Sequence, residues 1–230
     1  MLATKGMRFL IDVILVFIRW YAAYPLSYRH LEEIMQERGV FVDHSSINRC
    51  AIRFVPLLEK VFRKHKRAVG GSWRMDETYI KVKGAWKYLY RAVDKEGKTV
   101  DFLLTTRRDK AAALRFFDKA MKASGVPEKV TIDKSGVNKA AMDEINTQGE
   151  TPVIVRQVKY LNNIIEQDHR AIKRVTRPML NFKSFRADRN VLAGIELMHM
   201  IRKGQLLLEG CSKLSFADQF YGLAGKIRSV

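Results

Sequence analysis

The feature that most constrains the fold is a change in the spacing of apolar residues at Trp73. Before Trp73, apolar side chains recur every three or four residues, which is typical of helices. After it, apolar and polar side chains alternate in three runs rich in strand-forming residues, at 73–82, 86–93 and 99–106. Because the turns between these runs are short, the runs predict three consecutive antiparallel strands.

Helices and strands then alternate along the rest of the chain. Helices are predicted at 110–123, within 134–146, at 160–174 and within 184–208, and strands at 129–133 and 151–157. Three strands followed by helix, strand, helix, strand and helix predict a mixed five-stranded sheet with flanking helices. The fold class that fits this order is α/β, of the ribonuclease-H-like kind.

Residues 1–70 are predicted to form a small all-α domain that ends in a basic linker. Three helices are expected, at 9–24, 28–38 and 44–55. Ser27 and Asp43 are suitable N-cap residues for the second and third helices, and Gly39 suits the C-terminal end of the second. Pro56 is expected to end the third helix, before a basic connecting helix. Helix, glycine-containing turn and helix is the arrangement of a helix-turn-helix.

The composition favours a polyanionic partner. The 230 residues include 42 Lys and Arg against 24 Asp and Glu, and the resulting net charge of +18 attracts nucleic acid. One face of the third helix carries side chains able to bond phosphates and base edges of double-stranded DNA: Ser45, Ser46, Asn48, Arg49 and Arg53. A plain helical bundle with a polar outer face is the alternative. No segment has the pattern of a membrane-surface helix or a lipidation motif.

The two cysteines, Cys50 and Cys211, lie far apart in the chain and have no neighbours at metal-ligand spacing. We therefore expect reduced thiols in a cytoplasmic protein. For a basic protein with a nucleic-acid partner, we also expect association with the nucleoid. The apolar run at 13–18 is too short to span a bilayer and is expected to lie in a core helix.

Three acidic residues fall at informative places in the predicted elements. Asp76 lies midway along the first strand, Asp133 ends the fourth, and Glu166 lies on the helix after the fifth. If the first and fourth strands are neighbours, these carboxylates converge and repel one another unless cations bind them. Oxygen ligands suit Mg²⁺ or Mn²⁺, and two such ions support in-line displacement at phosphorus. Alternatively, each acid alone could be structural, as a strand-edge acid or a helix N-cap.

The predicted helix at 160–174 has an apolar stripe and an opposite polar face that carries Glu166. Basic residues on this helix are expected to hold a DNA strand: Arg170, Lys173 and Arg174. Asp168 falls in the apolar stripe. If it is buried, it needs a hydrogen-bonding or charged partner, which the sequence does not identify.

The sequence around these acids resembles a known family. The matching segments are MDETYIKVKGAWKYLYRAVD, TIDKSG and YLNNIIEQDHRAIKR, followed by RPMLNFKSF. Further matches near the N-terminus are KGMRF, PLSYRHLEEIMQERG and VDHSSINR. Together with the order and spacing of Asp76, Asp133 and Glu166, these segments resemble the DDE transposases of bacterial insertion-sequence family six over nearly the whole chain.

The resemblance implies an enzyme with an integrase-type catalytic core at 71–210, followed by a C-terminal tail at 211–230. It implies that the three acids bind Mg²⁺ or Mn²⁺, two ions per site, and catalyse DNA cleavage and strand transfer. It also implies that the N-terminal domain binds terminal inverted repeats, and that Lys173 contacts DNA near the reacting phosphate. Because two element ends must be joined, it implies a homodimer or a larger synaptic complex.

Two residues depart from the family pattern. Cys50 stands where relatives usually carry tryptophan, and Asn48 is not the usual residue at its place. These departures predict a less stable N-terminal domain or altered recognition of element ends. The alternative function is therefore a catalytically decayed DNA-binding protein derived from a transposase. A ribonuclease-H-like nuclease of another class and a basic protein that coats nucleic acid are further alternatives.

Overall fold

The fold comes from a computed structural model, which describes residues 9–149, 151–179, 184–207 and 214–228. The chain divides into two compact units. The helical unit comprises Met1–Arg67 and Ile172–Val230, and the sheet unit comprises Ala68–Ala171.

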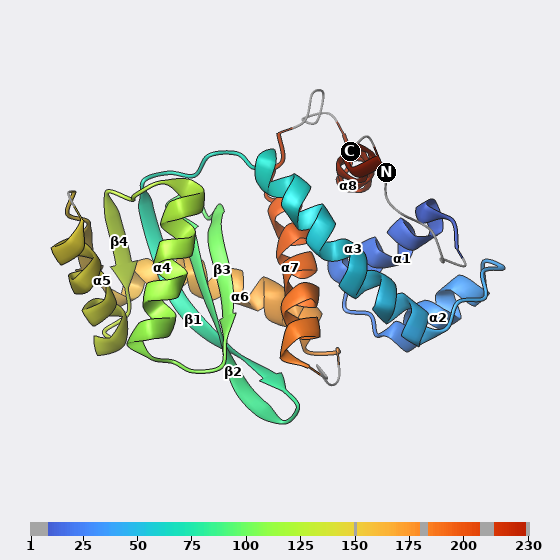
Figure 1. The fold of residues 1–230 in the computed structure, drawn as a ribbon, viewed down its shortest axis with the longest axis horizontal. Helices are drawn as coiled ribbons and strands as arrows, with labels where there is room; N and C mark the ends of the chain where they lie inside the picture. Colours follow the sequence, from blue (N-terminus) through green and yellow to red (C-terminus); the bar gives the residue numbers. More distant parts are fainter. Residues whose placement is uncertain (1–8, 150, 180–183, 208–213, 229–230) are drawn as a thin grey trace. The chain divides into compact units, whose positions relative to one another are not determined.

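The sheet unit is built on five strands in the order β3-β2-β1-β4-β5 (Figure 1). The strands are β1 (Ser72–Val82), β2 (Ala85–Asp94), β3 (Thr99–Thr105), β4 (Lys129–Ile132) and β5 (Ile154–Gln157). β2 is antiparallel to β1 and β3, whereas β4 is parallel to β1 and β5. This topology confirms the predicted mixed five-stranded sheet of the ribonuclease-H-like, α/β class.

Helices α4 (Lys110–Ser124) and α5 (Gly136–Gln148) flank the sheet, and Figure 1 shows α4 lying across it. Asp109 caps α4 by accepting a hydrogen bond from the backbone N–H of Ala112 at 2.8 Å. Within the core, Tyr90 of β2 stacks on Phe116 of α4 with 5.9 Å between ring centroids, and both residues are fully buried. Burying an aromatic ring of this size stabilises a fold by about 2–3 kcal/mol. This packing fixes which face of the sheet each strand residue occupies.

The helical unit contains the predicted N-terminal helices and two C-terminal ones. They are α1 (Ile11–Ala23), α2 (Tyr28–Gln36), α3 (His44–Lys64), α7 (Phe185–Arg202) and α8 (Phe216–Arg228). The predicted caps are confirmed. Ser27 Oγ accepts from the backbone N–H of His30 at 3.1 Å, and Asp43 Oδ1 accepts from that of Ser46 at 2.9 Å. Gly39 has a φ of 73°, the left-handed conformation that glycine adopts without steric cost.

The prediction that Pro56 ends the third helix is wrong, because α3 continues through it to Lys64. Proline lacks the N–H that would bond the carbonyl four residues earlier, so a proline inside a helix leaves the carbonyl of Ile52 without its usual donor. Asn190 of α7 supplies one, since its Nδ2 donates to that carbonyl at 3.2 Å. A side chain far away in the sequence thus allows one long helix where two were expected.

The compact units divide the C-terminal part of the chain differently from the expected domain boundaries. α7 packs against α1 and α3, and α8 packs against α3 and α7, so both belong to the helical unit. Residues 216–228, expected to lie in a weakly patterned tail, form α8. Cys211 lies outside the described residues, and Cys50 is buried with a free thiol. Within the described part of the chain, no helix is both long and apolar enough to cross a membrane.

Candidate active site

The register of the sheet brings Asp76 and Asp133 to adjacent backbone positions. β1 and β4 run parallel, and Arg74 is paired with Thr131. Asp76 and Asp133 each lie two residues beyond these partners, at the point where β4 ends. Neighbouring strands are about 5 Å apart, so the backbones of the two aspartates lie side by side. The expectation that the first and fourth strands are neighbours is confirmed.

Glu166 lies on α6 (Asn163–Thr176), which follows the short 3-10 helix η1 (Lys159–Asn162). Its side chain is exposed. One helical turn further on, His169 is buried, and its Nε2 lies 3.3 Å from Oδ2 of Asp76. Residues three apart in a helix lie on the same side. Glu166 is therefore close to the face of α6 that contacts Asp76.

A buried arginine joins α6 to the sheet. Arg91 lies opposite Asp76 on the neighbouring strand β2 and is fully buried. Its Nη2 donates to Oδ2 of Asp168 at 2.6 Å, and its Nη1 lies 3.4 Å from Nδ1 of His169. Hydrogen bonds between charged groups are strong, particularly where water is excluded. Asp168 thus has the charged partner that its burial requires, and the contacts link α6 to β1 and β2 beside Asp76.

Asp133 has a separate set of partners. Its Oδ1 accepts from the backbone N–H of Ser135 at 3.0 Å and lies 3.4 Å from Asn138 Nδ2, and its Oδ2 lies 3.4 Å from Arg108. Arg108 also pairs with Glu77, whose carboxylate is 2% exposed and accepts from Asn138 at 3.0 Å. Burial raises the pKa of Glu77, although the bonds from Asn138 and Arg108 oppose this shift. Arg108 and Asn138 therefore bridge Glu77 and Asp133, and Arg108 places positive charge beside Asp133.

The sequence did not identify several of these residues. Glu77 and Arg91 lie within a segment that matches the family, but the sequence assigned them no role, and Arg108 lies outside the matching segments. The one available signal was Asp168, an acid in an apolar stripe, which required a partner that the sequence could not locate. The partners come from other strands and loops, so only the fold reveals them.

The three carboxylates suit a hard divalent cation, because Mg²⁺ and Mn²⁺ prefer oxygen ligands. Two of the three come from adjacent strand ends, and the third lies near the face of α6 that touches Asp76. Among the described residues, however, no three His, Cys, Asp or Glu side chains form a group that could hold a metal ion. Asp76 and Asp133 are instead held by His169 and Arg108, so coordination by all three acids stays a prediction.

The predicted DNA-contacting residues lie on α3 and α6. On α3, Ser45, Arg49 and Arg53 are exposed, and Ser46 and Asn48 are partly buried; on α6, Arg170 and Arg174 are exposed, and Lys173 is partly buried. The hydroxyls of both serines donate to Asp43 at the start of α3, so in this structure they serve the helix cap. Contact between these residues and DNA stays a prediction.

Comparisons with known proteins found similar sequences. A family model described as a DDE domain matches residues 70–205. The transposase for insertion sequence-like element IS431mec from Staphylococcus aureus is 42% identical over 194 residues, which cover 84% of this chain and 85% of that protein. The transposase for insertion sequence element IS257 in transposon Tn4003, also from Staphylococcus aureus, has the same identity over the same shares of both chains.

A solved structure of the HTLV-2 integrase catalytic core domain, in complex with magnesium, is also similar. Its TM-score is 0.42 at 15% sequence identity, and the match covers 57% of this chain and 88% of that chain. The sequence relatives and the family model carry the assignment. By its sequence and its DDE domain, the chain belongs to the DDE transposases of insertion-sequence family six.

Proposed function

We propose that this insertion-sequence transposase binds the terminal inverted repeats of its element and catalyses DNA strand cleavage and strand transfer through Asp76, Asp133 and Glu166. The observation that supports these roles most directly is the β1–β4 register, in which the backbones of Asp76 and Asp133 are adjacent. In cleavage, water attacks phosphorus at the element end and the 3′-oxygen leaves. In strand transfer, the freed 3′-hydroxyl attacks phosphorus of the target DNA and displaces an oxygen there.

Membership of this family implies dependence on a divalent metal ion. In this proposal, Asp76, Asp133 and Glu166 hold two Mg²⁺ or Mn²⁺ ions. When bound, the ions supply activation of the attacking oxygen and stabilisation of the leaving oxygen. The chain's own contribution is to hold the carboxylates. His169 contacts Asp76, and the N–H of Ser135 fixes one oxygen of Asp133.

The DNA partner, which the family implies, is proposed to contact two helices. α3 presents Arg49 and Arg53, whose guanidinium groups can bond phosphates and guanine edges in the major groove. α6 presents Arg170 and Arg174, and Lys173 lies two turns beyond Glu166 on the same helix, where it can contact the strand beside the reacting phosphate. Domain 1–70 is thus proposed to recognise the repeats, and 71–210 to carry the chemistry.

The assembly is proposed to be a homodimer or a larger synaptic complex, because transposition joins two ends of one element. Its place of action is proposed to be the cytoplasm, at the nucleoid where its DNA substrate lies. The net charge of +18 favours association with DNA at low salt and weakens it as salt rises.

The test is strand transfer in vitro by the full chain, with a duplex oligonucleotide that carries the element's end, a target plasmid and Mg²⁺. Glu166→Gln keeps the side-chain shape but removes a negative metal ligand, so it should abolish joining while leaving binding of the duplex unchanged. Glu96→Gln, at an exposed glutamate between β2 and β3, is the matched control and should join normally.

Loss of joining with EDTA and with Glu166→Gln, but not with Glu96→Gln, would support the assigned role of Glu166. Specific binding of the element's end without any joining by the wild-type chain would instead support the alternative. In that case the protein is a catalytically decayed, DNA-binding derivative of a transposase.

A further inference from the structure

The hairpin of β1 and β2 extends past the rest of the sheet, as Figure 1 shows. β3 pairs with β2 only as far as Tyr88, and β4 pairs with β1 only as far as Arg74. Residues 79–87, here named the hairpin arm, continue as two strands without a third strand beside them among the described residues. Lys83 and Gly84 form its turn with φ of 48° and 78°, the left-handed values of a tight hairpin turn.

One face of the hairpin arm exposes aromatic rings. Tyr79 is 47% exposed and Trp86 is 60% exposed. The ring of Tyr79 lies 6.4 Å from that of Trp86 and 5.4 Å from that of Tyr88, between centroids. Packing across the strands explains why the rings touch one another. It does not explain why the rings are exposed to solvent, since the side chains on the opposite face of β1, those of Ile80 and Val82, are buried. Exposed large apolar groups that cluster in this way mark a binding surface.

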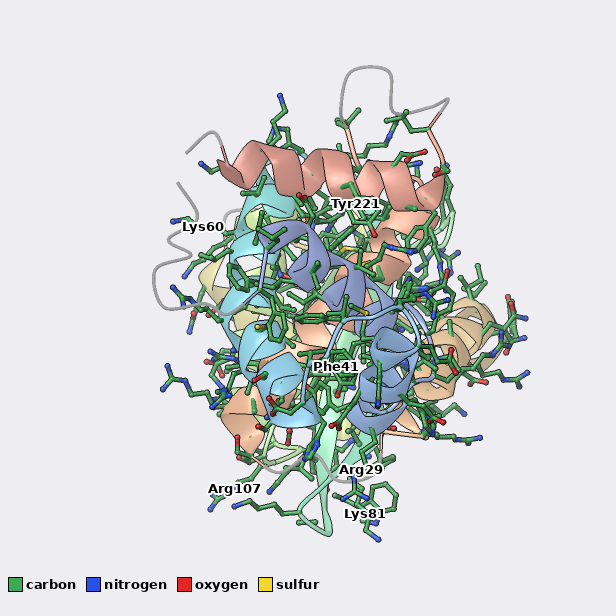
Figure 2. The ribbon with its side chains drawn as sticks, turned by 90° about the vertical axis from the view of Figure 1, so that its right-hand side faces the viewer. Arg29, Phe41, Lys60, Lys81, Arg107 and Tyr221 are labelled. Atoms are coloured by element: carbon green, nitrogen blue, oxygen red, sulfur yellow. The ribbon has the colours of Figure 1, made fainter. Side chains whose placement is uncertain are left out.

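The hairpin arm is also basic. It carries Lys81, Lys83 and Lys87, and no acidic residue lies between 79 and 88. Nζ of Lys81 lies 5.8 Å from the centroid of the Trp86 ring, and Figure 2 shows the Lys81 side chain reaching out from the hairpin. Rings that stack on bases beside lysines that contact phosphates are the combination that binds single-stranded nucleic acid. The positive charge favours a nucleic acid over a second copy of this basic chain.

We propose that the hairpin arm binds unpaired bases of a DNA strand next to the reacting phosphate. This inference rests on the proposed function, because it uses Asp76 as the reference point. Tyr79 lies three residues beyond Asp76 on β1, about 10 Å along the strand, and Trp86, opposite Lys81, lies about 17 Å along it. Successive nucleotides of one strand in double-stranded DNA are about 3.4 Å apart along the axis, and an unpaired strand is more extended. The two rings therefore lie at most about three and five nucleotides, respectively, from the reacting phosphate.

The test measures binding of the full chain to a fluorescein-labelled oligothymidylate by fluorescence anisotropy, in EDTA so that no chemistry occurs. Trp86→Ala should raise Kd by about 5- to 150-fold, the equivalent of about 1–3 kcal/mol for one stacked base. Trp86→Phe keeps a ring and should recover most of the affinity. Lys81→Ala should reduce the slope of log K against log salt by about 0.7.

Lys95→Ala is the matched control, because Lys95 is an exposed lysine on the other hairpin, between β2 and β3. It should change the affinity far less than Trp86→Ala. Equal affinities of wild type and Trp86→Ala, or equal losses in Trp86→Ala and Lys95→Ala, would overturn the proposal. A change in oligomer mass with no change in DNA affinity would also overturn it, by assigning the face to a second copy of the chain.

The binding assay separates this proposal from the proposed function. If wild type joins DNA ends but Trp86→Ala binds oligothymidylate normally, only the role of the hairpin arm fails. If wild type binds the oligonucleotide through Trp86 but never joins ends, only the catalytic proposal fails.

Discussion

Removing the buried cation of Arg91 should destabilise the protein more than any surface substitution. Arg91 is fully buried and bonds Asp168, whose side chain is 8% exposed, at 2.6 Å. Arg91→Met keeps an apolar chain in the same space but leaves the carboxylate of Asp168 without this cation in a site that excludes water. Breaking a buried ion pair by removing one partner costs about 3–5 kcal/mol.

The assay is urea denaturation of the full chain, followed by far-ultraviolet circular dichroism. With an m-value of about 2 kcal/mol per molar urea, the Arg91→Met midpoint should fall by about 1.5–2.5 M. Asp168→Asn retains the shape and removes only the charge, so it remains measurable if Arg91→Met does not fold. Lys98→Met is the control, because the ion pair of Lys98 with Glu96 is at the surface and should contribute less than about 1 kcal/mol.

The double variant Arg91→Met, Asp168→Leu tests the cause. Replacing a whole buried ion pair by apolar residues is often neutral, so the double variant should be more stable than Arg91→Met alone. Two results would refute the reasoning. One is a decrease of less than about 1 kcal/mol in the free energy of unfolding of Arg91→Met. The other is a double variant that is no more stable than Arg91→Met, because the buried charge of Asp168 would then not be the cause of the instability.

Three further predictions concern other parts of the chain. Asn190→Ala removes the donor to the Ile52 carbonyl and should cost about 1–2 kcal/mol in urea denaturation, and an unchanged midpoint would contradict the explanation for helix continuity through the proline. Arg49→Ala and Arg53→Ala should each reduce the salt slope of duplex binding by about 0.9, and slopes equal to wild type would exclude phosphate contacts by these residues. Because burial raises the pKa of Glu77 above its ordinary 4.5, its ionisation costs the folded state more than the unfolded one. The stability of wild type relative to Glu77→Gln should therefore fall as pH rises from about 4.5 towards neutrality, and urea midpoints that keep a constant difference across this range would contradict the assignment.

Local chemistry made much of the fold predictable. Ser27 and Asp43 cap their helices as expected, because an N-cap acts on backbone N–H groups only three residues away. Alternation located β1, β2 and β3 to within a few residues, since side chains on successive strand positions face opposite sides of the sheet. The end of α3 could not be predicted in the same way, because the group that donates a hydrogen bond to the Ile52 carbonyl in place of Pro56 is the side chain of Asn190, far away in the sequence.

The sequence alone determined the element order, the basic charge and the three acids, because these depend on residue types and short spacings. The five-stranded sheet follows from the element order, whereas the class of enzyme follows from the resemblance of the segments around the acids to a known family. Only the tertiary structure decided which residues surround the acids. Arg91 meets Asp168 and Arg108 meets Asp133 because separate strands and loops pack together, and no local pattern encodes such pairs. The placement of α7 and α8 with the N-terminal helices likewise depends on burial of apolar faces between distant segments.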